Sequence, residues 1–487
     1  MRHRFPFLML FASIAYFPLF SAPVRIHGVA VQYAGMNLVL ETYNNFISNR
    51  TRPIGILQVD SKGHFEGEVE VEEVTQVFLE LGRYRAHLFV EPNGDYQVVL
   101  PDYEARPDAD RFNPFYQSEN ILLGIANQPA KNLNQALSRL DDEYEYLYNK
   151  NAIDLVRRQY IRLADQMMVS LDSLNNAIDH PFYRDYLHFR KAIFFALPRN
   201  RQMSFITRSF FSNSPVLYNN PAYWDAFRSI YSGFLDGYIR SGKGKSFASV
   251  FQSTNRFDSI CGALTSDSLF CNVPFGEVML LKHLYDGYYS GKVSGDKASL
   301  VIGDAVQTAS SPQIRSIAVD LLARINHLKI GSQAPSFQLK NLKGKEVELS
   351  DFKGKFVYLA FLHTKNYACI KDLPALEALS NRYKKNLVVV GIVTNENVEE
   401  AEAYFKNNPV SWPILPFTSG QRIVFDYNIS VLPAYYLINP EGKMALSPAP
   451  NPGDNFSKVF NDIFQTYSNQ QIRKERPKEK NIYDLSR

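Results

Sequence analysis

The chain has 487 residues, of which 45% are hydrophobic and 21% charged, so it holds enough apolar material for several buried cores and is not a largely disordered protein. At about 100 to 200 residues per domain, this length suggests three domains. The 53 basic and 49 acidic residues leave a net charge of +4, which is too small and too mixed to indicate a nucleic-acid surface.

The N-terminus has the order of features that is typical of secretory signals. Arg2 and Arg4 precede an apolar run from Phe5 to Phe20, and the small residues Ser21 and Ala22 follow it. Because the run is short for a membrane-spanning helix, residues 1–22 are predicted to be a signal peptide that exports the chain. An uncleaved N-terminal anchor is the alternative, since Phe20 is unfavourable just before a cleavage site.

Residues 23–105 alternate apolar and polar positions between turn signals. This period of two is clear in GILQVDSKGHFEGEVEV (55–71) and in VFLELGRYRAHLFVEPNGDYQVVL (77–100). Lys62-Gly63 and Asn93-Gly94 are natural turn sites within these stretches. The pattern predicts an all-β module, interpreted as a small β-sandwich.

Residues 115–327 change to the period of an α-helix. Apolar residues recur at three-and-four spacing at Leu133, Ala136, Leu137, Leu140, Tyr144 and Leu147. We predict a helical domain here. Its many Tyr and Phe residues at helical spacing are interpreted as core rather than as a binding surface.

Residues 329–468 alternate between strand and helix patterns. The segments are KFVYLAFL (355–362), IKDLPALEALSNRYKK (370–385), NLVVVGIV (386–393), NVEEAEAYFKNN (397–408) and AYYLINPEGKMAL (434–446). This alternation predicts an α/β domain with strands buried on both faces, so the whole chain is predicted to be a multidomain α+β protein. The charged residues 469–487 are predicted to be a solvated tail, with a partner-binding arm as the alternative.

Two motifs in this last region carry a family resemblance. The segments IGSQAPSFQLKNLKGKEVELSDFKGKFVYLAFL (330–362) and ISVLPAYYLINPEGK (429–443) resemble the TlpA family of exported thioredoxin-fold proteins, a branch of the thioredoxin and peroxiredoxin superfamily. The resemblance implies a thioredoxin-like fold, kinship with thiol-disulfide oxidoreductases and a cis peptide bond before Pro433. The first two regions resemble, more loosely, modules that precede such domains in Gram-negative envelope proteins, which implies a periplasmic or cell-envelope location.

The family's Cys-x-x-Cys motif is incomplete in this chain. In the family the first thiol attacks from a helix N-terminus and the second resolves the mixed disulfide. The matching positions hold Asn366, Tyr367, Ala368 and Cys369, followed by Asp372 and Pro374. Asparagine cannot act as the attacking nucleophile, so dithiol chemistry within this motif is excluded.

Cys369 leaves three interpretations open. The first is a peroxidase, because the peroxiredoxin branch places its attacking thiol at this second position in a Pro-x-x-x-Thr-x-x-Cys pattern. Leu362 and Asn366 stand at the Pro and Thr positions of that pattern, which weakens the match. The second is other monothiol chemistry, and the third is a small buried hydrophobe on an inert scaffold.

The segment around Pro433 has a binding interpretation and a structural one. By resemblance, the backbone beside this proline pairs with an extended polypeptide, and Leu432 and Tyr367 supply apolar contacts. The alternative is a turn retained only for the fold. His363 and Lys365 on the preceding loop are interpreted as exposed polar residues, with ligand contact as the alternative.

Cys261 and Cys271 are close in sequence, and in an oxidising compartment they can form a structural disulfide; two unpaired thiols are the alternative. The spacing of Cys and His residues does not match a zinc site, and we expect neither a metal nor another cofactor.

The favoured function is an exported envelope protein that binds a protein or peptide in its thioredoxin groove, without nucleic acid. The alternative is a monothiol oxidoreductase or peroxidase that uses Cys369.

Overall fold

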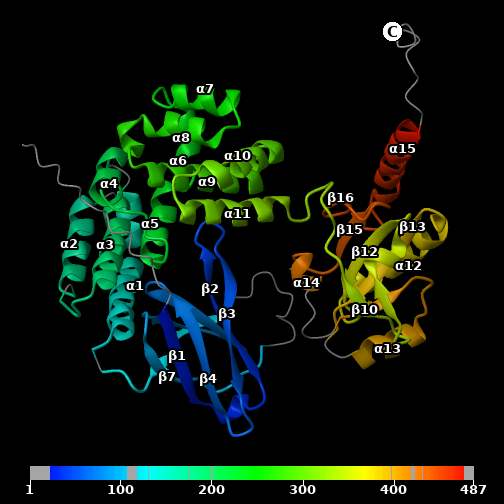
Figure 1. Cartoon of the computed structure of the whole chain (residues 1–487), viewed down its shortest axis with the longest axis horizontal. Helices are drawn as coiled ribbons and strands as arrows, with labels where there is room; N and C mark the ends of the chain where they lie inside the picture. Colours follow the sequence, from blue (N-terminus) through cyan, green and yellow to red (C-terminus); the bar gives the residue numbers. More distant parts are fainter. Residues whose placement is uncertain are drawn as a thin grey trace, which may run out of the picture. The chain divides into compact units, whose positions relative to one another are not determined.

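The computed structural model describes residues 22–106, 118–129, 131–158, 160–174, 176–198, 201–395, 398–417, 423–429 and 431–475. The predicted signal peptide, apart from Ala22, and the predicted tail beyond residue 475 lie outside these residues. Within them, no helix is both long and apolar enough to cross a membrane. The described chain forms two compact units, one of residues 22–106 with 118–322 and one of residues 323–475 (Figure 1).

The first unit begins with a nine-stranded sheet, which confirms the all-β character predicted from alternation. Its strands are β1 (Ala22–Val29), β2 (Asn37–Asn45), β3 (Arg50–Val59), β4 (His64–Val71), β5 (Thr75–Leu81), β6 (Tyr84–Val90), β7 (Asp95–Val99), β8 (Glu119–Leu122) and β9 (Gly124–Ile125), in the order β8-β6-β5-β2-β3-β4-β1-β7-β9. Inward residues alternate with outward ones, as Val24 and Ile26 of β1 illustrate.

The last two strands lie at the two ends of the strand order. β8 pairs with β6 at one end of the order and β9 pairs with β7 at the other, yet only Leu123 separates β8 from β9. The nine strands form one hydrogen-bonded order with one buried apolar cluster. The placement of residues 119–125 in the helical region is corrected, because they form β8 and β9 and helical periodicity begins only at Leu133.

The rest of the first unit is helical, as predicted. Its helices are α1 (Leu133–Arg158), α2 (Ile161–Asp172), α3 (Pro181–Ala196), α4 (Met203–Phe210), α5 (Pro221–Tyr231), α6 (Phe234–Arg240), α7 (Lys245–Ser253), α8 (Phe257–Thr265), α9 (Val273–Tyr289), α10 (Gly295–Thr308) and α11 (Pro312–Asn326). The predicted aromatic core is confirmed, with Phe189, Phe211, Tyr223 and Phe227 almost fully buried. Each of these rings contributes strongly to the packing because it buries a large apolar surface.

Sheet and helices share contacts within this unit. The side chain of Asn134 at the start of α1 accepts from Phe89 N at 2.7 Å and donates to Phe89 O at 2.8 Å, so a buried amide completes the hydrogen bonds of β6. The ring of Phe46 stacks on Trp224 of α5 with centroids 5.9 Å apart. The two predicted regions are thus packed together in one unit.

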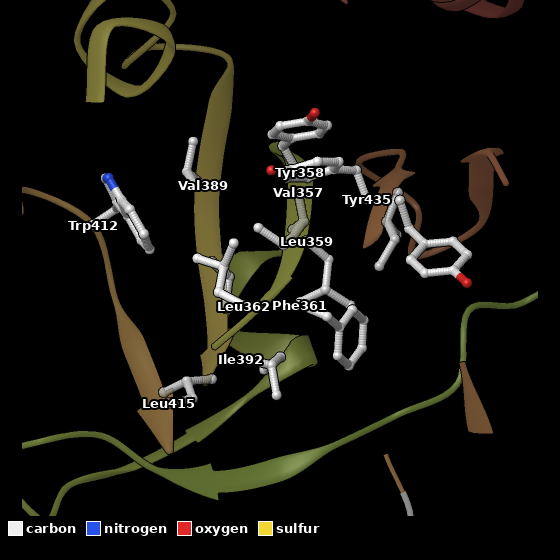
Figure 2. Close-up of a cluster of buried hydrophobic side chains, with 14 of the residues drawn as sticks. Val357, Tyr358, Leu359, Phe361, Leu362, Val389, Ile392, Trp412, Leu415 and Tyr435 are labelled. Carbon is white, nitrogen blue, oxygen red and sulfur yellow. The ribbon is translucent and has the colours of Figure 1, made fainter. Parts of the chain in front are cut away.

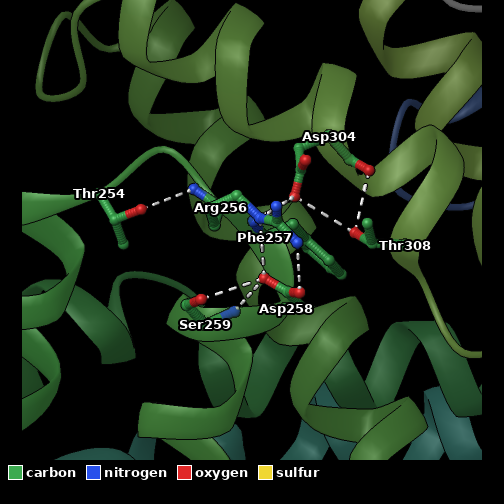
Figure 3. Close-up of polar contacts among 7 residues, drawn as sticks. All are labelled: Thr254, Arg256, Phe257, Asp258, Ser259, Asp304 and Thr308. Atoms are coloured by element: carbon green, nitrogen blue, oxygen red, sulfur yellow. Dashed lines mark hydrogen bonds and ion pairs between the residues drawn. The ribbon is translucent and has the colours of Figure 1, made fainter.

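One carboxylate joins two helices of this unit. Asp304 of α10 accepts a 2.8 Å hydrogen bond from the backbone N–H of Phe257, the first residue of α8 (Figure 3). It also accepts from the Thr308 hydroxyl at 3.3 Å and lies 3.8 Å from Arg256. Since the first N–H groups of a helix have no partner inside it, Asp304 acts as a cap supplied by a different helix.

The second unit is the predicted thioredoxin-like α/β domain. Its elements are β10 (Gln338–Lys340), β11 (Glu346–Glu348), β12 (Phe356–Leu362), α12 (Tyr367–Arg382), β13 (Leu387–Val393), α13 (Val398–Asn407), β14 (Ile414–Pro416), α14 (Ile423–Asp426), β15 (Ala434–Ile438), β16 (Met444–Leu446) and α15 (Phe456–Glu475). The main sheet has the order β14-β13-β12-β15-β16, and β10 pairs separately with β11. β13 and β14 run parallel to β12, whereas β15 runs antiparallel to it.

β12 lies in the middle of this sheet, and all seven of its residues are buried. Leu359 and Phe361 of β12 and Ile392 of β13 belong to one apolar cluster (Figure 2). A continuous apolar run of this kind is expected where helices cover both faces of a sheet. α15 continues to Glu475, so the predicted tail begins as helix, and Gln471 in that stretch donates to Glu441 at 2.9 Å.

Candidate functional site

The site lies where β12 ends and α12 begins. The buried strand stops at Leu362, residues 363–366 turn, and α12 starts at Tyr367 with Asn366 as its N-cap. Asparagine is among the preferred N-cap residues because its short side chain can accept hydrogen bonds from the first free N–H groups of the helix. The structure therefore gives Asn366 a role that does not require a thiol.

Asn366 bonds in two directions. Its Oδ1 accepts from the backbone N–H of Ala368 at 2.9 Å and of Cys369 at 3.3 Å. Its Nδ2 donates to the carbonyl oxygen of Leu432 at 3.4 Å. The Asn366 side chain thus joins the start of α12 to the segment before β15, and its amide is not a nucleophile.

Cys369 is buried inside the first turn of α12, with 2% of its surface exposed. Burial is the main reason that the pKa of its thiol is raised to about 11; a hydrogen bond with the His363 backbone lowers it in part, and the charge of Asp372 raises it. The thiolate is the reactive form of cysteine, so a buried thiol with this pKa is a poor nucleophile near neutral pH. This environment fits the predicted shielded position.

Asp372 points toward the sheet. Its Oδ2 accepts a 2.8 Å hydrogen bond from the hydroxyl of Tyr435 in β15, and the ring of Tyr435 stacks on Tyr358 of β12. Sequence reasoning missed this partner of Asp372, which lies 63 residues away along the chain. Pro374, by contrast, lies inside α12 and is exposed, as an interior helix proline without a chemical role.

The predicted groove residues lie around this helix start. The Leu432–Pro433 peptide bond is cis, as the resemblance predicted. Leu432 is 9% exposed, whereas Tyr367 is 80% exposed and Val431 is 51% exposed. The side chains of Tyr367 and Val431 are therefore exposed to water, and they belong to the residues next in sequence to Asn366 and Leu432, which contact each other.

The turn before Asn366 is held by residues that sequence reasoning missed. Asn395, which follows β13 and is buried, accepts from Thr364 N at 3.0 Å and donates to the Thr364 hydroxyl at 2.6 Å. Lys365 pairs with Glu400 of α13 at 2.9 Å, and this contact is the main cause of the lowered pKa of Glu400. Lys365 is exposed and His363 is half-buried, with its Nδ1 accepting from Lys365 N. Position at the end of β13 was the only sequence signal for Asn395.

The other two cysteines are unbonded in the structure. Cys261 is buried in α8, where burial raises the pKa of its thiol to about 12, and Cys271 is exposed. The predicted disulfide between them is therefore not formed, and only Cys261 fits the alternative of a core thiol. No group of three His, Cys, Asp or Glu side chains suited to a metal ion occurs among the residues that the structure describes.

Comparisons with known proteins match the second unit. The AhpC/TSA family model matches residues 330–447. The thiol-disulfide oxidoreductase ResA of Bacillus cereus is 31% identical over 118 residues, which cover 24% of this chain and 68% of that protein. ResA of Bacillus subtilis (strain 168) is 36% identical over 118 residues, which cover 23% of this chain and 64% of that protein.

The chain belongs to the AhpC/TSA thioredoxin-fold family, among relatives of the ResA and TlpA kind. The solved thioredoxin domain of a Bacteroides vulgatus thiol-disulfide oxidoreductase is also similar, with 27% identity, a TM-score of 0.26 and coverage of 28% of this chain and 97% of that one. A thiol:disulfide interchange protein from Bacteroides sp. has 27% identity, a TM-score of 0.27 and coverage of 28% and 91%. The family match is confined to about a quarter of the chain.

Proposed function

We propose that this family member is an exported cell-envelope protein whose thioredoxin-like domain binds extended polypeptide without dithiol chemistry. The observation that carries the proposal is Asn366, which caps α12 from the position of the attacking thiol. The one cysteine of the motif is buried and has a raised pKa, which supports the same conclusion.

The exposed side chains support a binding role. Tyr367 and Val431 place apolar surface in water. Val431 directly precedes Leu432, and Tyr367 directly follows Asn366, whose side chain contacts the carbonyl of Leu432. Strand addition takes affinity from main-chain hydrogen bonds and selectivity from nearby side-chain contacts. An extended polypeptide without strong sequence preference is therefore the partner that this surface fits.

A thiol-free probe tests the proposal. Carboxamidomethylated insulin B chain, labelled with a dye, is titrated with the full chain and followed by fluorescence anisotropy. Removal of the exposed ring in Tyr367→Ser should weaken binding about tenfold, because an aromatic contact in an interface contributes about 1 to 2 kcal/mol. Tyr146→Ser, which removes a tyrosine that is 57% exposed in α1, is the matched control and should leave binding unchanged.

Two results would count against this function. If the wild-type chain fails to bind the probe, or binds it equally well after Tyr367→Ser, the surface is not a polypeptide site. Cys369→Ser separates the two candidate functions, because binding without chemistry does not need the thiol. With insulin whose disulfides are intact, a mixed disulfide that the wild-type chain forms and Cys369→Ser does not would instead favour the monothiol oxidoreductase, because the Cys369 thiolate would attack an insulin disulfide and release one insulin thiolate.

Export is proposed from the N-terminal sequence, and the start of β1 is compatible with it. Ala22 already pairs with Val71 in the ladder, so a chain cleaved before Ala22 or Pro23 keeps the whole of β1 or nearly so. Mass spectrometry of envelope fractions should find a mature N-terminus near these residues. Recovery of the full-length chain in the cytoplasm would contradict export.

A further inference from the structure

The side chain of Asn366 makes an additional contact that N-capping does not require. Capping uses only Oδ1, which accepts from Ala368 N and Cys369 N. Nδ2 faces the opposite way and donates to the carbonyl oxygen of Leu432. Asparagine offers an acceptor and a donor on one planar group, whereas an aspartate at the same place offers acceptors alone.

The contacted carbonyl belongs to the proposed groove. Leu432 precedes Pro433, which has no N–H, so the carbonyls and the few N–H groups of residues 431–434 are the main-chain groups that this segment offers to a partner. Strand addition uses such groups. In the free protein, however, one of these carbonyls already has a donor from within the chain.

We propose that Asn366 is an internal competitor for the groove: its Nδ2 occupies the carbonyl oxygen of Leu432, and an extended polypeptide that pairs there displaces it. This inference rests on the proposed polypeptide-binding function and adds its regulation. At 3.4 Å the contact lies beyond the usual range of about 2.7 to 3.2 Å, so it is weak and a partner loses little by replacing it. The capping bonds of Oδ1 can remain while Nδ2 is released, since they involve a different atom.

Two substitutions separate the contact from the cap. Asn366→Asp keeps an acceptor for Ala368 N and Cys369 N but has no donor for Leu432 O. Asn366→Ala loses both the cap and the donor, and it adds no charge beside the carbonyl. Hydrogen exchange of the full chain, resolved by NMR or mass spectrometry, reports on residues 431–434 and on the first turn of α12 at the same time.

Both variants should exchange faster than wild type at the amides of Val431, Leu432 and Ala434, by about threefold for the loss of one weak hydrogen bond. Only Asn366→Ala should also exchange faster at Ala368 and Cys369. Faster exchange at residues 431–434 in the aspartate variant alone would indicate charge repulsion and would overturn the inference.

Binding of the alkylated insulin B chain completes the test. Both variants should bind it about threefold more tightly than wild type, because the carbonyl is released in advance. Equal or weaker binding in both variants would overturn the competitor while leaving the proposed function intact, and absence of binding in all three chains would overturn both.

Discussion

The hydroxyl of Tyr435 in β15 donates a 2.8 Å hydrogen bond to the carboxylate of Asp372 in α12, and so joins this strand to the helix that begins at the candidate site. Burial is the largest cause of the raised pKa of Tyr435, and the hydrogen bond to Asp372 is the next. The phenol therefore keeps its proton across the physiological range. The family's acidic position serves here as an acceptor that orients helix against sheet.

Removing the hydroxyl in Tyr435→Phe should destabilise the second unit by about 1 to 3 kcal/mol, because it leaves a half-buried carboxylate oxygen without this donor. The measurement is hydrogen exchange across a urea series, read on peptides from residues 323–475 of the full chain. Tyr367→Phe removes a hydroxyl from a ring that is 80% exposed and should have no measurable effect. Equal stability of the two variants would show that the Tyr435–Asp372 bond contributes nothing.

The three cysteines should differ sharply in their reaction with iodoacetamide. At neutral pH the exposed Cys271 should be alkylated fast, whereas the buried Cys261 and Cys369 should be protected in the folded chain. Peptide mapping after timed alkylation measures each site separately. Alkylation of Cys369 as fast as that of Cys271 would contradict the shielded thiol and favour monothiol chemistry.

Alkaline pH should weaken the second unit through Cys369. The pKa of this thiol is raised in the folded state from an ordinary value of 9.0 to about 11, so the folded chain holds the proton more firmly than the unfolded chain. The resulting stability is complete below about pH 9 and is lost as the pH rises to about 11. Cys369→Ser should remove this part of the pH dependence in urea titrations of residues 323–475. An unchanged pH profile in that variant would show that the thiol does not contribute.

Asp304→Ala should loosen the start of α8 by about 1 to 2 kcal/mol, the usual effect of losing an N-terminal cap. The carboxylate that this substitution removes accepts hydrogen bonds from Phe257 N and from the Thr308 hydroxyl. Exchange of the α8 amides in the full chain measures the change. Asp258→Ala is the control, because that exposed carboxylate pairs with the exposed Arg256 and should matter much less. Equal increases in α8 amide exchange for the two variants would show that Asp304 does not act as a cap.

Local patterns predicted the elements of this chain better than their connections. The apolar run of β12 and the motif at residues 366–374 predicted a buried central strand followed by a helix, and both are present. Residues 119–125 were missed as strands because they are short, and their pairing with β6 and β7 depends on partners distant in sequence. Alternation reports which residues face inward, but it does not report which strands pair with one another.

Within the site, too, local features were predicted from the sequence, whereas contacts between distant residues were not. The burial of Cys369 and the cis bond before Pro433 were predicted from the motif and its resemblance. The partners of Asn366, Asp372 and Thr364 were not, because Leu432, Tyr435 and Asn395 lie 66, 63 and 31 residues away along the chain. The preference of asparagine for helix N-caps was available in the sequence and would have indicated the role of Asn366.

Asn366→Cys should restore dithiol chemistry. It places a thiol at the N-terminus of α12, where the helix dipole and free N–H groups lower a cysteine pKa, with Cys369 in the resolving position. Loss of the amide cap should cost about 1 kcal/mol, which a folded domain tolerates.

Reduction of insulin by dithiothreitol, followed by turbidity, should run at the uncatalysed rate with wild type and clearly above that rate with Asn366→Cys. Asn366→Ser keeps a capping oxygen without a thiol and should stay inactive. The double variant Asn366→Cys, Cys369→Ser, mixed with insulin in the absence of dithiothreitol, should accumulate a mixed disulfide with insulin, because no second thiol is present at the motif to resolve it. Insulin reduction by wild type that disappears in Cys369→Ser would show that Cys369 is redox-active. A folded Asn366→Cys chain without activity would show that a cysteine at position 366 is not sufficient for dithiol chemistry.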